Sequence, residues 1–145
     1  MCVNKEQDRY FLKIAEVVAE AATCNRLSVG AVIVKEGKVI ATGYNSAPYG
    51  KLTCKEVGCL HDKQGRCKRT LHAEAAAVIS SPVRPEGATI YVTHYPCEGC
   101  ANVILGAGIK RIVYLNHYDN EISDEILREI NVVQWSDEEW KPSFH

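Results

Sequence analysis

Residues 88–115 read ATIYVTHYPCEGCANVILGAGIKRIVYL, and this stretch decides the fold class. The segment 88–93 alternates as a strand does, and 111–115 is rich in the branched residues that favour strands. Between them, 97–105 is predicted to be a helix that ends at Gly106 and Gly108, because glycine commonly follows the last helical turn. Strand and helix therefore alternate, as they do in an α/β domain.

The segments before this stretch add a helix and a hairpin. Strands are predicted at 29–34 and 39–42, on either side of the polar turn 35–38. Upstream of them, apolar residues recur at helical spacing over 5–22 and predict a helix with one buried face. Its expected buried residues are Tyr10, Phe11, Ile14, Ala15, Val17, Val18 and Ala21.

The segments that remain complete the pattern. An alanine-rich helix is predicted at 71–80, a helix at 123–130 with Ser123 as its N-cap, and a last strand at 132–135. Residues 45–69 show neither helical nor strand periodicity, and we expect a long functional loop that a bound metal could order. The element order α, β, β, α, β, α, β, α, β predicts a layered α/β domain with a mixed sheet.

Length and charge limit the classes of function. With 145 residues, the chain is expected to form a single domain over 1–145. A net charge of −1 argues against a broad nucleic-acid surface, so we expect no nucleic-acid partner. The sequence contains no apolar run long enough to indicate a signal peptide or a membrane span. We therefore expect a cytoplasmic protein without membrane contact. In such a compartment, the seven cysteines are more simply explained by metal than by disulfides.

Two short motifs together predict a catalytic zinc site. His72 precedes Glu74 by two residues, and Cys97 and Cys100 lie three residues apart at the start of a predicted helix. Three protein ligands leave one coordination position open, whereas structural zinc takes four. A zinc-bound water is then the expected nucleophile. Two thiolates neutralise the zinc charge, which makes a nearby base useful, and Glu74 is predicted to shuttle protons in both directions.

This pairing of motifs is the signature of zinc nucleobase deaminases. The chain resembles the cytidine deaminase superfamily and, within it, the deoxycytidylate deaminases, from about Arg26 to Tyr118. The resemblance lies in residues 29–34, 43–45, 71–74, 91–100 and 108–111. It implies a three-layer α/β/α fold with a five-stranded mixed sheet. It also implies zinc-dependent hydrolysis of dCMP to dUMP and ammonia, which supplies thymidylate synthesis.

The residues that would bind the nucleotide are less clearly marked than the metal ligands. Arg26, a cation before the first strand, is the candidate for the 5′-phosphate, with a solvated turn arginine as the alternative. The resemblance places Asn45 at the sugar or base and adds Ala73, while Tyr118 could cover the ring. The resemblance also implies a homo-oligomer. In some members of the family, dCTP and dTTP regulate activity by binding near the residues that match 43–45. Ser46 stands where the family frequently has glycine, which argues against this regulation here.

A second group of cysteines predicts a second, structural zinc. Cys54, Cys59 and Cys67 crowd one loop, and Cys24 ends the first helix, so four thiolates could tie the loop to that helix. His61 is the alternative ligand, and unligated thiols are the alternative to the site itself. Two rival functions remain open: another deaminase of this fold, acting on a different cytosine nucleoside or nucleotide or on tRNA adenosine, or a non-enzymatic zinc module. Glu74 argues against the zinc module.

Overall fold

A computed structural model describes residues 5–23 and 27–136 of the chain. A five-stranded sheet with the order β2-β1-β3-β4-β5 lies at its centre. β1 pairs antiparallel with β2 and with β3, whereas β3, β4 and β5 run parallel, so the predicted mixed sheet is confirmed. The strands are β1 (Gly30–Lys35), β2 (Lys38–Tyr44), β3 (Thr89–His94), β4 (Arg111–Asn116) and β5 (Asn131–Gln134).

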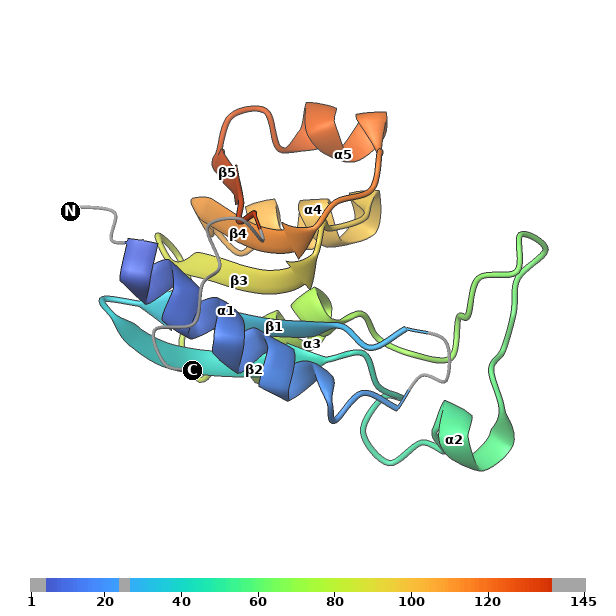
Figure 1. Ribbon diagram of the computed structural model, residues 1–145. Coiled ribbons are helices and arrows are strands. Elements are labelled where there is room, and N and C mark those ends of the chain that lie inside the picture. The colour runs from blue at the N-terminus through green and yellow to red at the C-terminus, as the bar shows by residue number, and fades with distance from the viewer. Residues whose placement is uncertain (1–4, 24–26, 137–145) are drawn as a thin grey trace.

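Helices cover both faces of this sheet. α1 packs on one face, whereas α3 and α4 lie on the other, with α5 beside α4 (Figure 1). The predicted three-layer α/β/α arrangement is therefore confirmed. The helices are α1 (Lys5–Ala19), α2 (Cys54–Val57), α3 (Ala73–Ser80), α4 (Glu98–Gly106) and α5 (Glu121–Ile126). None of the helices in the described part of the chain has the length and apolar character needed to cross a membrane.

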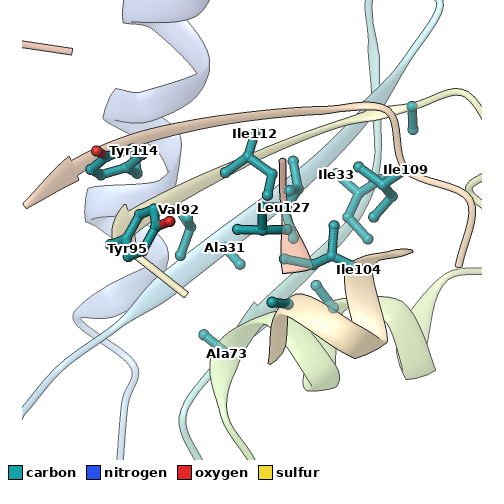
Figure 2. Packing of buried hydrophobic residues seen from close by; sticks show 14 of the residues in the cluster. Ala31, Ile33, Ala73, Val92, Tyr95, Ile104, Ile109, Ile112, Tyr114 and Leu127 are labelled. Atoms are coloured by element: carbon teal, nitrogen blue, oxygen red, sulfur yellow. The ribbon is translucent and has the colours of Figure 1, made fainter. Parts of the chain in front are cut away.

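Alternation along the central strands builds a separate core on each face. Ile33, Val92 and Ile112 point toward α3 and α4, where Ile104 joins them (Figure 2). Their sequence neighbours point the other way, and Val32 packs there against α1. The sheet is thus buried on both sides, as the apolar strands of an α/β protein require.

Two glycines let a helix approach the sheet closely. A Cβ on Gly43 of β2 would lie 2.3 Å from the Ala73 carbonyl oxygen and 2.3 Å from the Ala77 nitrogen, both in α3. A Cβ on Gly30 of β1 would lie 2.0 Å from the Ala15 carbonyl oxygen in α1. Because only hydrogen fits in these gaps, α1 and α3 rest directly on the strand backbones.

The structure corrects three local predictions. α1 ends at Ala19, and its expected apolar face is partly wrong, since Tyr10 and Val17 are each 61 % exposed and Ala21 is also exposed. The buried stripe instead includes Leu12 and the carboxylate Asp8.

The N-cap of α5 is Asn120, not Ser123, because the Asn120 side chain accepts a hydrogen bond from the Ser123 backbone N–H. The expected loop 45–69 contains the short helix α2. Thr53 and Glu56 form a capping box at its start, with each side chain binding the other's backbone N–H.

Candidate metal centre and active site

Two helix N-termini bring the predicted metal ligands together. His72 is the N-cap residue of α3 and Cys97 is the N-cap residue of α4, and neither side chain makes a capping hydrogen bond. Their extended backbone conformations, with ψ of 154° and 171°, turn each side chain out of its helix. Cys100 lies in the first turn of α4 and is almost fully buried. The side chains are therefore available for a ligand between the helices.

The distances within this group suit a metal ion. Nδ1 of His72 lies 3.4 Å from Sγ of Cys97 and 3.3 Å from Sγ of Cys100, and all three ligand atoms lie within 4.8 Å of one another. Zinc bonds of about 2.0 Å to nitrogen and about 2.3 Å to sulfur put tetrahedral ligand atoms about 3.6 Å apart. The two distances from His72 are therefore close to those of a zinc site.

The electrostatics of the group also favour a cation. The hydrogen bond from Cys100, together with His72, lowers the pKa of the Cys97 thiol to about 4. The same Cys97 neighbour and burial raise the pKa of Cys100. One thiolate therefore forms readily, while a second thiolate beside it needs a compensating positive charge. A divalent cation supplies that charge.

Glu74 lies in the first turn of α3, two residues beyond His72, and is only 4 % exposed. Burial raises the pKa of its carboxyl to about 7. The carboxyl also lies close enough to Cys97 and Cys100 for the charges of these groups to act on one another. A buried carboxyl beside three side chains that could hold a metal ion can exchange protons with a ligand bound there.

Comparisons with known proteins agree with this geometry. The family model of MafB19-like deaminases matches residues 5–141. The deoxycytidylate deaminase of Mycobacterium phage D29 is 41 % identical over 118 residues, which are 74 % of this chain and 92 % of the phage protein. The chain belongs to the deoxycytidylate deaminases. This family lies within the cytidine deaminase superfamily that the motifs indicate.

Two further relatives of this chain are informative. ComE operon protein 2 of Bacillus subtilis is 43 % identical over 114 residues, which cover 77 % of this chain but only 60 % of that protein. A crystal structure of the dCMP deaminase from cyanophage S-TIM5, in complex with dCMP and dUMP, has a TM-score of 0.78 at 30 % identity. It covers 92 % of this chain and 100 % of the phage chain.

The second cysteine group of the chain also assembles. The thiols of Cys54, Cys59 and Cys67 lie within 4.8 Å of one another, and Sγ of Cys54 is 3.5 Å from Sγ of Cys67. Burial acts against ionisation of Cys67, but hydrogen bonds from the backbone N–H groups of Arg69 and Leu60 lower its pKa to about 7. Three of the four predicted ligands are thus in place.

Among the described residues, no fourth ligand joins the three clustered thiols. Cys24, the predicted fourth ligand, lies outside the described residues. His61, the alternative ligand, faces Cys67 across an isolated bridge but is not part of the group of clustered atoms. The identity of the fourth ligand therefore stays a prediction.

The segment that carries these cysteines is closed at its base, next to the active site. Ser46 and Leu71 pair through two backbone hydrogen bonds of 3.1 and 2.7 Å. Residues 47–70, which include α2, extend beyond this bridge and away from the sheet (Figure 1). We call 47–70 the insert. Because His72 follows Leu71 directly, the same bridge helps to fix the first predicted metal ligand.

The predicted substrate contacts have different surroundings. Asn45 is 7 % exposed, and its amide accepts from the Val29 N–H at 2.8 Å and donates to the Leu27 carbonyl at 2.6 Å. Asn45 thus braces the chain before β1, and its contact with sugar or base stays a prediction. Ala73 has no exposed surface, so its contact also stays a prediction, while Arg26 lies outside the described residues.

Tyr118, the fourth predicted contact, lies beside the metal-ligand group. Its ring meets the ring of Tyr95 edge-on, with centroids 5.9 Å apart, and Tyr95 leads through one proline into Cys97. Burial raises the pKa of the Tyr118 phenol to about 12, and the charges of Cys97 and Glu74 add to this effect, while a hydrogen bond with the Asn120 side chain opposes it. With 41 % of its surface exposed, Tyr118 can still meet a ligand.

Motif reasoning missed the polar contact between α4 and α5. Asn120 Nδ2 donates to Glu98 Oε2 at 2.9 Å, and this bond lowers the pKa of Glu98. An asparagine ahead of the acidic residues of α5 is itself an N-cap signal. The sequence holds no sign, however, that the same amide reaches a residue 22 positions earlier.

Proposed function

We propose that this chain hydrolyses dCMP to dUMP and ammonia at a zinc ion bound by His72, Cys97 and Cys100. The observation that carries the proposal is the buried Glu74 carboxyl beside this one-nitrogen, two-sulfur ligand group. The family membership and the cyanophage dCMP deaminase bound to dCMP and dUMP support the choice of substrate. Zinc held by three protein ligands supplies, when bound, an activated water as nucleophile.

Glu74 performs the proton transfers in this proposal. Its carboxylate takes one proton from the attacking water and gives it to the ring nitrogen N3 of the cytosine. It then takes the remaining proton of that oxygen and gives it to the departing amino group, which leaves as ammonia. The carboxylate is regenerated, and the net reaction consumes one water for each ammonia released.

Cations of the insert are candidates for binding the 5′-phosphate, besides Arg26. Lys51, Lys68 and Arg69 line a hollow with a volume of about 450 Å³. The hollow lies near the Ser46–Leu71 bridge. The hydrogen bond with Cys97 raises the pKa of His72, and the nearby positive charge of Lys68 acts weakly against this rise. Lysine and arginine side chains are well suited to phosphate oxygens.

A second zinc, held by Cys54, Cys59, Cys67 and a fourth ligand, is proposed to order the insert. Three clustered thiols are one short of the tetrahedral four-ligand set of structural zinc, and Cys24 is the proposed fourth. Assembly as a homo-oligomer stays a prediction, which light scattering tests by measuring the mass in solution. Regulation by dCTP or dTTP also stays a prediction, which deaminase assays with each added nucleotide test.

One assay separates this function from its rivals. Purified, zinc-loaded protein is incubated separately with dCMP, deoxycytidine, CMP, dCTP and an adenosine-bearing tRNA stem-loop, and the released ammonia is measured. Fastest release from dCMP is expected. Activity confined to deoxycytidine would contradict phosphate recognition, activity on the stem-loop alone would indicate a tRNA deaminase, and no ammonia from any substrate would indicate a zinc-binding module.

A further inference from the structure

The loop between β4 and α5, residues 117–120, carries Tyr118 and is attached at both ends. At its start, the Asn116 carbonyl accepts from the Tyr95 N–H at 2.9 Å, and Asn116 Nδ2 donates to the Thr93 carbonyl at 2.8 Å. Both bonds tie the loop to the segment that leads into Cys97. The position of Tyr118 is therefore coupled to the position of the metal ligands.

At the other end of the loop, the nitrogen and the oxygen of the Asn120 amide each make a hydrogen bond. Its Nδ2 donates to Glu98 Oε2 at 2.9 Å, and its Oδ1 accepts from the Ser123 N–H at 3.0 Å. Glu98 lies directly after Cys97 and is the first residue of α4. One side chain thus joins the start of α5 to the helix that presents two metal ligands.

Only an amide can make both of these bonds. An aspartate could still accept from Ser123, but it has no hydrogen to donate to the Glu98 carboxylate and would place a second negative charge beside it. The use of asparagine, which is no better as an N-cap than aspartate, points to the contact with Glu98.

We propose that Asn120 is a positioning residue that acts through Glu98 to hold Tyr118 against the base of a nucleotide bound at the metal centre. This inference rests on the proposed deaminase function. Without the bond to Glu98, the loop keeps its attachment at Asn116 but loses its anchor to α4, and Tyr118 meets the substrate less often. Substrate binding should weaken more than the chemical step.

The test exchanges the donor and the acceptor of this bond. Asn120→Asp alone should raise KM for dCMP by about tenfold, as expected for losing one hydrogen bond to a charged group, with kcat changed by less than about twofold. Adding Glu98→Gln supplies an amide that donates to the carboxylate introduced on the loop, and KM should return to within about threefold of the starting value. Glu98→Gln alone keeps an acceptor and should raise KM only slightly. Asn102→Asp, an exposed change of the same kind on α4, is the matched control.

A second measurement separates positioning from loss of structure. Zinc content is checked for each variant, and amide hydrogen exchange is measured over 116–121 in the substrate-free protein. Asn120→Asp should speed exchange there, and the double variant should restore it. If the double variant remains as impaired as Asn120→Asp, or if Asn120→Asp raises KM equally in a Tyr118→Ala background, the proposal is wrong. If the starting protein fails to deaminate dCMP, the proposed function fails, and the exchange data still decide whether the Asn120–Glu98 bond holds the loop.

Discussion

The carboxylate of Asp8 accepts two parallel hydrogen bonds from the guanidinium of Arg111, at 2.8 and 2.7 Å. A third bond comes from the Tyr91 hydroxyl at 2.7 Å. Asp8 is only 3 % exposed, and the pair joins α1 to the first residue of β4. The layer opposite the active site is therefore held by a buried, bidentate ion pair as well as by apolar packing.

Removing Asp8 should destabilise the fold strongly. Asp8→Ala leaves the Arg111 guanidinium in a largely buried site without its counter-charge, and the free energy of unfolding should fall by about 3 to 5 kcal/mol. Urea denaturation followed by circular dichroism measures this change. Glu16→Ala, an exposed carboxylate on the same helix, should change it by less than about 0.5 kcal/mol. Equal losses in the two variants would contradict a role for the pair.

Glu74→Gln should slow turnover strongly but keep the metal. The amide fills nearly the same volume in the buried site but cannot accept and return a proton, so kcat should fall by about two orders of magnitude or more. Ammonia release and zinc content are measured on the same sample. Glu129→Gln, an exposed position between α5 and β5, is the control. Near-normal turnover of Glu74→Gln would exclude Glu74 as the proton shuttle.

Zinc stoichiometry tests the two metal groups separately. The protein should contain two zinc ions per chain by atomic emission. Cys67→Ser should lose one of them and make the insert sensitive to limited proteolysis, because few apolar contacts order that segment without metal. Cys100→Ser should instead lose the other zinc together with deaminase activity. One zinc per chain in the unaltered protein would contradict the second site.

Lys68→Gln tests phosphate recognition by the insert. Loss of a cationic contact should raise KM for dCMP by about tenfold and leave KM for deoxycytidine, which has no phosphate, nearly unchanged. Steady-state kinetics with both substrates provide the comparison. Lys63→Gln lies in the same insert but does not line the hollow, and it controls for general loss of charge. A parallel rise for both substrates would place Lys68 outside the phosphate site.

Gly43→Ala should disturb the candidate active site by displacing α3. The added methyl group would overlap the α3 backbone, and the free energy of unfolding should fall by about 1 to 3 kcal/mol as α3 shifts. Because α3 begins next to His72 and contains Glu74, kcat should fall as well. Thermal denaturation and ammonia release are the measurements. Gly106→Ala, which has no heavy atom within 4 Å of the added Cβ, should leave both values nearly unchanged.

Local sequence patterns predict the sheet and the clustering of His72, Cys97 and Cys100 well. Strand alternation and glycine-terminated helices are short-range signals, and the two motifs place His72 and Cys97 at helix starts, where the structure has them. Asp8 shows the limit of such signals. Its burial depends on Arg111, 103 residues later in the chain, and no periodicity within one helix contains that information.

The insert was the least predictable segment for a different physical reason. It contributes little to either apolar core, so it has no hydrophobic period from which its structure could be deduced. Its order comes from polar contacts such as the Thr53–Glu56 capping box and from the three cysteines. The capping box is a sequence signal that could have revealed α2.

The bridge between Ser46 and Leu71 also bears on how this domain can be altered. Since two backbone hydrogen bonds already hold the ends of the insert together, the entropy of closing the intervening chain changes only slowly with its length. Changes in the length of the insert, outside its cysteines and the cations of the hollow, should therefore cost little free energy of closure. Outside the cations that line the hollow and the three clustered cysteines, its composition is free to vary independently of the chemistry that takes place at its base.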